Sequence, residues 1–120
     1  LISASPPPDD ERRQSPDEVR LLESAVRCIL CACCTASCPV NQNPETADYV
    51  GPAALVRAFR YLFDSRDQGF VERVPVLDRK QGAWGCQTLW KCTEVCPKQI
   101  PVTKSIGQIK RRIHEAKKGT

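Results

Sequence analysis

The stretch CILCACCTASCP, residues 28–39, contains five of the chain's eight cysteines. Four of them, Cys28, Cys31, Cys34 and Cys38, have the spacing C-x₂-C-x₂-C-x₃-C, and Pro39 follows directly. Bacterial-type ferredoxins bind iron–sulfur clusters with this spacing. Three thiolates in one tight loop hold three corners of a cubane, while the fourth points away and binds a second cluster. The run therefore predicts at least one iron–sulfur cluster.

A second run, GCQTLWKCTEVCP at residues 85–97, matches the same template except that Leu89 occupies the second cysteine position. Because the last cysteine of each run serves the other cluster, two ligand sets follow. The first set has four thiolates and predicts a 4Fe–4S cluster: Cys28, Cys31, Cys34 and Cys96. The second set has only three and predicts a 3Fe–4S cluster, because leucine cannot bind iron: Cys38, Cys86 and Cys92.

Other interpretations of the cysteines stay open at this point. Leu89 could reflect decay that leaves the second site empty. Structural zinc prefers four ligands in two short pairs, which the three-thiol set does not supply. A disulfide framework normally spreads its cysteines to close long loops, whereas all eight of these lie in two tight runs. Cys33 is outside both sets; we expect a small buried residue, although spacing alone does not exclude Cys33 in place of Cys34.

Composition excludes several classes of protein. No apolar run approaches the roughly 20 residues of a membrane-spanning helix, and the N-terminal residues do not resemble a signal peptide. The sequence contains no methionine, even at position 1, which suits a processed or partial chain. The net charge of +4 is unevenly distributed along the chain. Residues 98–120 contain seven Lys or Arg and only one Glu. Such a tail can face acidic lipid headgroups or an acidic partner, or form a solvated helix face. We expect no nucleic-acid partner.

The pattern along the chain predicts an all-α fold: a small helical ferredoxin-like domain with two cysteine-rich cluster-binding loops. Residues 1–14 are predicted to be an extended lead-in, and residues 15–120 the two-cluster domain. A capping box, Ser15 to Glu18, starts a helix that runs to about Cys28, with Val19, Leu22 and Val26 on one stripe. Further helices are predicted from Pro52, around 70–74 and from about Thr103. Their apolar residues recur at helical spacing: Leu55, Phe59 and Leu62, then Val102, Ile106, Ile109, Ile113 and Ala116, opposite Lys104, Lys110, Arg111 and Lys117.

Several motifs in one order resemble a known family, the iron–sulfur subunit of succinate dehydrogenase and fumarate reductase in respiratory complex II. They are QSPDE (14–18), CILCACCTASCP (28–39), GPAALVRAFRYLFDSRD (51–67), the run C-x₅-C-x₃-CPK (86–98) and IPVTKSIGQIK (100–110). The resemblance implies a non-catalytic electron-transfer subunit of an oxidoreductase, which carries single electrons from a flavoprotein subunit toward a membrane quinone. It implies the same two ligand sets, and the family likewise lacks a cysteine at the position of Leu89.

The resemblance also implies partners and a location. Family members normally begin with a domain that carries a 2Fe–2S cluster, which this sequence lacks; either the chain is a fragment, or another polypeptide supplies that domain, as in euglenozoan protists. The implied partners are the flavoprotein subunit, the 2Fe–2S domain or chain, and membrane anchor subunits. The implied location is the matrix side of the mitochondrial inner membrane, or alternatively the cytoplasmic side of a bacterial plasma membrane. The chain would be peripheral, with no transmembrane helix of its own.

The quinone site, for ubiquinone or another quinone, departs from the family pattern. Many members have a Trp after the first Cys-Pro and a His after the cysteine that matches Cys86. Here Val40 to Asn43 and Gln87 take those places. Pro39, Gln87, Leu89 and Trp90 are the residues expected in the pocket, although Trp90 is also expected to fill a place in the core.

Two alternative functions have different signatures. The first is a relay subunit of another complex. In a fumarate reductase such a subunit uses the same electron path in the opposite direction. In a complex of the heterodisulfide-reductase or glycolate-oxidase type, it normally has four cysteines in both ligand sets. A non-redox interaction module would hold clusters only for structure.

Overall fold

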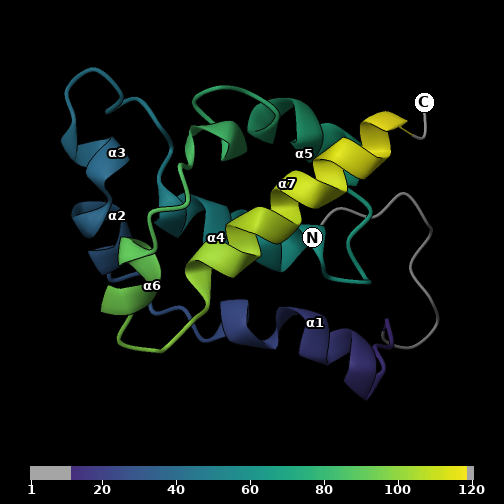
Figure 1. The fold of residues 1–120 in the computed structure, drawn as a ribbon. Helices are drawn as coiled ribbons and strands as arrows, with labels where there is room; N and C mark the ends of the chain where they lie inside the picture. Colours follow the sequence, from purple (N-terminus) through teal and green to yellow (C-terminus); the bar gives the residue numbers. More distant parts are fainter. Residues whose placement is uncertain (1–11, 119–120) are drawn as a thin grey trace.

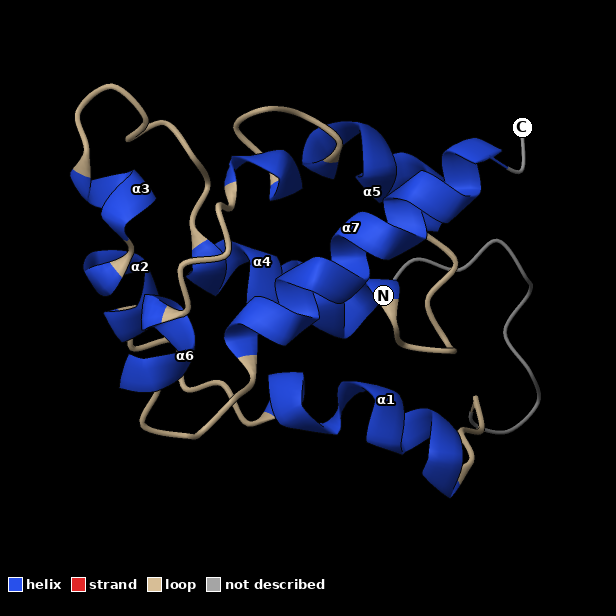
Figure 2. Cartoon of the chain, in the orientation of Figure 1, coloured by secondary structure: helices blue, strands red, loops and turns tan. Residues whose placement is uncertain are grey.

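The computed structural model describes residues 12–118, so most of the predicted lead-in lies outside the described residues. Within residues 12–118 the chain forms helices, turns and loops without a β-strand (Figure 2), which confirms the predicted all-α class. The helices are α1 (Pro16–Val26), α2 (Cys33–Ser37), α3 (Pro39–Gln42), α4 (Pro52–Leu62), α5 (Phe70–Leu77), the 3₁₀ helix η1 (Ala83–Gly85), α6 (Lys91–Val95) and α7 (Val102–Lys118).

The core lies between α4 and α7, the long C-terminal helix drawn in yellow in Figure 1. The predicted α4 stripe is buried, and so are Ile106, Ile109 and Ile113 of α7. Ala116, at the end of the α7 stripe, is half-buried. Each fully buried aliphatic side chain contributes about 1.5–3 kcal/mol relative to its exposed state, so this interface provides the rigid body of the molecule.

Helix α1 begins at the predicted capping box, but the face that it buries differs from the prediction. The Ser15 hydroxyl accepts a hydrogen bond from the Glu18 amide (3.2 Å), and the Glu18 carboxylate accepts one from the Ser15 amide (3.0 Å). The helix ends at Val26, before Cys28. Leu22 is buried as expected, but Val19 and Val26 are exposed, because α1 packs mainly against α4 through a narrow line that contains Leu22 and Ala25.

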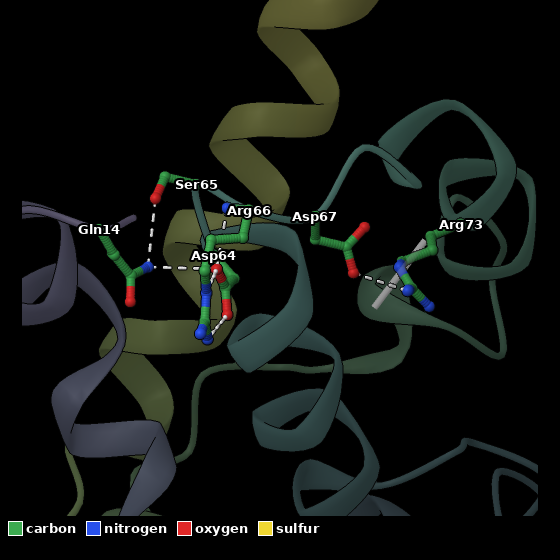
Figure 3. Close-up of polar contacts among 6 residues, drawn as sticks. All are labelled: Gln14, Asp64, Ser65, Arg66, Asp67 and Arg73. Carbon is green, nitrogen blue, oxygen red and sulfur yellow. Dashed lines mark hydrogen bonds and ion pairs between the residues drawn. The ribbon is translucent and has the colours of Figure 1, made fainter. Parts of the chain in front are cut away.

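A buried carboxylate organises the turn between α4 and α5 (Figure 3). The side chain of Asp64 is fully buried; its carboxylate accepts hydrogen bonds from the Arg66 guanidinium at 2.8 and 3.0 Å and from the Gln14 amide at 3.1 Å. Arg66 therefore lowers the pKa of Asp64. Asp67 pairs in the same way with Arg73 (2.8 Å). After this turn, α5 extends to Leu77, beyond the predicted 70–74.

Helices α2, α3 and α6 gather at one end of the molecule, beside the N-terminal ends of α4 and α7 (Figure 1). These three helices have only four or five residues each, too few to be stable alone in water. Both cysteine runs lie at this end. Among residues 12–118, no helix is both long and apolar enough to cross a membrane.

Candidate iron–sulfur centres

The first cavity is lined by cysteines from both runs. Three of its thiols come from the first run and the fourth from the end of the second: Cys28, Cys31, Cys34 and Cys96. Apolar side chains of α4 and α7, Val56 and Val102, form the inner wall. Four thiols around an apolar cavity are a donor set that fits a 4Fe–4S cluster.

The second cavity is the counterpart with one thiol fewer. It is lined by Cys38, Cys86 and Cys92, together with Leu89 and the α7 residue Ile106. Within the described residues, no three Cys, His, Asp or Glu side chains converge closely enough to hold a single metal ion. Three thiols spread around a cavity fit a 3Fe–4S cluster, whose iron atoms need one thiolate each.

The two cysteine loops have the same backbone conformation at matching positions. Leu30 and Ala32 in the first loop have φ of 60° and 61°, and Thr88 and Trp90 in the second have φ of 58° and 65°. A left-handed conformation costs a non-glycine residue about 1–2 kcal/mol. It turns the Leu30 amide toward the sulfur of Cys28 and the Thr88 amide toward that of Cys86, each at 3.4 Å. Leu89 therefore occupies the place that Cys31 has in the first loop.

The last cysteine of each run lies at the end of a short helix. Cys38 follows α2 and Cys96 follows α6; both have extended backbones (ψ 120° and 117°) and both precede a proline. Because α2 packs against α6, each of these cysteines faces the cavity of the other run. The match between the two cysteine runs thus has a structural counterpart, and the crossed arrangement results from the α2–α6 contact.

Hydrogen bonds favour the thiolate form at the exposed Cys31. The backbone amide of Cys33, and after it the Cys33 thiol, lower the pKa of the Cys31 thiol. Iron binds the thiolate, so this environment suits a ligand. Cys33 itself is exposed, and the expectation that it is buried was wrong. The short helix α2 begins at Cys33 and turns the next residue, Cys34, toward the cavity instead.

The four residues expected near a quinone all line the second cavity: Pro39, Gln87, Leu89 and Trp90. Gln87 and Leu89 are exposed at its mouth. Trp90 is 52% exposed, so the expectation that it fills a core position was wrong. Trp90 also lines an adjoining open groove with Lys104 and Arg111.

Two supporting residues were not recognised from the sequence. Lys110, expected on the solvent face of α7, is half-buried and donates a hydrogen bond to the Cys86 carbonyl oxygen (2.8 Å). Tyr49, in a loop that gave no signal beyond its turn residues, is buried against the second cavity. Burial raises the pKa of Tyr49, and the Cys86 and Cys38 thiols raise it further, so the hydroxyl stays protonated.

Comparisons with known proteins agree with this geometry. Residues 24–100 match the family model described as "4Fe-4S dicluster domain". The chain is 42% identical over 101 residues to the mitochondrial succinate dehydrogenase [ubiquinone] iron-sulfur subunit of Candida glabrata, with 83% of this chain and 39% of that protein covered. This chain belongs to the succinate dehydrogenase iron–sulfur subunit family.

Other members of the succinate dehydrogenase iron–sulfur subunit family align in the same way. The subunit of Paracoccus denitrificans is 39% identical over 111 residues, with 92% of this chain and 42% of that protein covered. The Coxiella burnetii subunit is 38% identical over 111 residues, with 92% and 46% covered. A solved structure, the Mycobacterium smegmatis Sdh1 complex in the apo form, has a TM-score of 0.79 and 27% identity over 97% of this chain and 51% of that chain.

The chain spans less than half the length of the curated relatives it matches, and the match falls in their C-terminal region. The predicted helical two-cluster fold is confirmed by the family match and by the helical structure. Which thiols bind which cluster stays a prediction.

Proposed function

We propose that this chain is the two-cluster, electron-transfer part of the iron–sulfur subunit of a succinate:quinone oxidoreductase. The observation that carries the proposal is the pairing of a four-thiol cavity with a three-thiol cavity in a member of this family. The chain would carry out no chemistry on the dicarboxylate itself. No observation favours a heterodisulfide-reductase or glycolate-oxidase type relay, and the leucine at position 89 opposes it.

In this proposal each cavity holds one cluster. Cys28, Cys31, Cys34 and Cys96 would hold a 4Fe–4S cluster, and Cys38, Cys86 and Cys92 a 3Fe–4S cluster. When bound, such clusters accept and release single electrons. The chain holds the sulfurs in place, directs the amides of Leu30 and Thr88 at two of them, and lines both cavities with apolar side chains.

The three-thiol cavity is the proposed quinone end. Gln87 is exposed at its mouth and can donate a hydrogen bond from its side-chain amide to a quinone carbonyl oxygen, in place of the family's usual histidine. Pro39, Leu89 and Trp90 supply apolar contacts around the same opening. The quinone would be ubiquinone or another quinone at a site shared with membrane anchor subunits.

The remaining partners and the location are proposed from the family. They are a flavoprotein subunit, a 2Fe–2S domain or chain, and the membrane anchors. We propose a peripheral position on the matrix side of the mitochondrial inner membrane, with the cytoplasmic side of a bacterial plasma membrane as the alternative. One relative is a mitochondrial protein, which supports the first position as far as the organelle.

Electron paramagnetic resonance of the air-oxidised, iron-loaded protein tests the proposal. An oxidised three-iron cluster has an odd number of unpaired electrons, so we expect a sharp signal from it. Leu89→Cys restores the fourth thiol and is expected to replace this signal with the properties of a second 4Fe–4S cluster. Leu89→Ala is the matched control, because it removes the same side chain without adding a ligand and should leave the three-iron signal. An unchanged spectrum and iron content in Leu89→Cys would contradict the ligand assignment.

A further inference from the structure

Thr103 is a buried hydroxyl group that the proposed function does not use. It is the second residue of α7, is 4% exposed, and its Oγ1 lies 3.3 Å from the sulfur of Cys92. Cys92 is also buried and lines the three-thiol cavity. At this distance a hydroxyl and a sulfur form a hydrogen bond, so the direction of that bond becomes the question.

The neighbouring bonds fix the direction once Cys92 is an iron ligand. The Thr103 amide donates to Thr93 Oγ1 (3.0 Å), and the two hydroxyl oxygens of Thr93 and Thr103 are 2.7 Å apart. A thiolate that binds iron has no proton and only accepts. Thr103 must then donate its hydroxyl proton to Cys92, and accept the proton of the Thr93 hydroxyl. Thr93 in turn accepts from the Thr103 amide, so every group in the chain is satisfied.

The four-thiol cavity lacks this arrangement. There Thr35 has the place of Thr93, and its Oγ1 accepts a hydrogen bond from the amide of Ala53 (3.1 Å), the second residue of α4. Ala53 has the place in α4 that Thr103 has in α7, so at this position α4 has no hydroxyl group that could bind a cysteine sulfur. The Thr35 hydroxyl instead interacts with its neighbour Cys34 directly. The hydroxyl supplied by a long helix is therefore specific to the second cavity.

We propose that the Thr103 hydroxyl donates a hydrogen bond to the Cys92 thiolate and thereby raises the reduction potential of the cluster held in the three-thiol cavity. Reduction adds negative charge that is shared with the sulfurs, and a hydrogen-bond donor stabilises the more negative form. Thr93 is a positioning residue that orients the Thr103 hydroxyl, and successive bonds in such a chain strengthen one another. This inference rests on the proposed function, because it needs a cluster at Cys92.

A redox titration of the iron-loaded protein, followed by electron paramagnetic resonance, tests the proposal. Thr103→Val keeps the shape of the side chain and removes the donor. We expect the equilibrium constant for reduction of the three-iron cluster to fall roughly tenfold, which corresponds to about 59 mV for one electron. Thr103→Ser keeps the hydroxyl and is expected to stay near the wild-type value. The four-iron cluster should not change in either variant.

Ser105→Ala is the matched control. Ser105 is 2% exposed in the same turn of α7, and its hydroxyl donates to the Pro101 carbonyl oxygen (3.0 Å) instead of to a cysteine. Its loss should lower stability without changing either potential. A three-iron potential that is the same in Thr103→Val and wild type, or a fall of equal size in Ser105→Ala, would overturn the proposal.

Two further measurements keep the test decisive. If the valine variant does not load iron, Thr103→Ala makes the same comparison with a smaller side chain. Electron–nuclear double resonance in D₂O should reveal a slowly exchanging proton coupled to the oxidised cluster that is present in the wild type and missing from the variant without the Thr103 hydroxyl, and identical proton signals in the two proteins overturn the proposal. Absence of the three-iron signal from the wild type would instead contradict the proposed function, so the two failures are distinguishable.

Discussion

Gly85 is a position in the second loop where a side chain would not fit. A Cβ atom at this position would lie 2.6 Å from Tyr49 Cδ1 and 2.9 Å from the Lys80 carbonyl oxygen. Gly85 directly precedes Cys86, so the buried tyrosine ring packs on the backbone that carries a proposed ligand. Gly107 in α7 has the opposite environment, since nothing lies within 4 Å of a Cβ there.

The same substitution should therefore have opposite effects at the two glycines. Gly85→Ala is expected to lower the free energy of unfolding by about 1–3 kcal/mol through overpacking, and to reduce the three-iron signal by displacing Cys86. Gly107→Ala should raise stability by about 0.5–1 kcal/mol, because glycine is a poor residue inside a helix. Thermal unfolding of the loaded proteins and their iron content measure both effects. If the two variants changed the melting temperature and the iron content in the same way, the close packing at Gly85 would be refuted.

At the residue scale, local patterns were predictable and distant contacts were not. The cysteine spacings, the Ser15–Glu18 capping box and the α7 stripe each depend on residues a few positions apart. The position of Lys110 depends on a carbonyl oxygen 24 residues away, and that of Trp90 on a left-handed backbone. Neither leaves a periodic signal in the sequence. Apolar spacing also does not reveal how narrow a helix contact is, so the exposure of Val26 could not be predicted from it.

At the scale of elements, the two long core helices are each attached to a cysteine run by a threonine. Thr35 accepts a hydrogen bond from the amide of Ala53, the second residue of α4, and Thr93 accepts one from the amide of Thr103, the second residue of α7. An ordinary N-cap lies directly before its helix and can be recognised from sequence. These two threonines lie 18 and 10 residues from their donors, so no sequence pattern identifies them.

Asp64 connects three elements, since it lies after α4, binds Arg66 before α5 and accepts a bond from Gln14 before α1. Its lowered pKa means that its ionised form stabilises the folded state. This contribution is complete above the unfolded pKa, about 3.9, and is lost as the pH falls through the folded value.

Asp64→Asn should accordingly lower the free energy of unfolding at neutral pH by about 1–3 kcal/mol, because the half-buried Arg66 guanidinium loses the buried, charged acceptor that it binds. Asp17→Asn is the comparison: Asp17 also pairs with an arginine, Arg20 at 2.6 Å, but its side chain is 88% exposed. Exposed pairs contribute less than about 1 kcal/mol. Melting temperatures of the loaded variants measure the difference, and similar losses in both would show that burial of Asp64 is not what matters.

At the scale of the whole molecule, two parts of the structure are stabilised in different ways. The α4–α7 body buries a continuous set of aliphatic side chains against one another. The end formed by α2, α3 and α6 has helices of four or five residues, and seven of its cysteines line two cavities. Such short helices depend on tertiary contacts, and in the loaded protein the cysteine–iron bonds supply them.

Removal of iron should therefore loosen one end before the other. Metal-binding free energy acts as folding free energy where the apo segment has no core of its own. After reductive chelation, hydrogen exchange followed by mass spectrometry is expected to rise strongly in residues 28–42 and 86–99, and much less in α4 and α7. A sample treated with iron-saturated chelator controls for the reagents. Equal acceleration along residues 12–118 would mean that the molecule opens as one cooperative unit, and that the body depends on the clusters as much as the loops do.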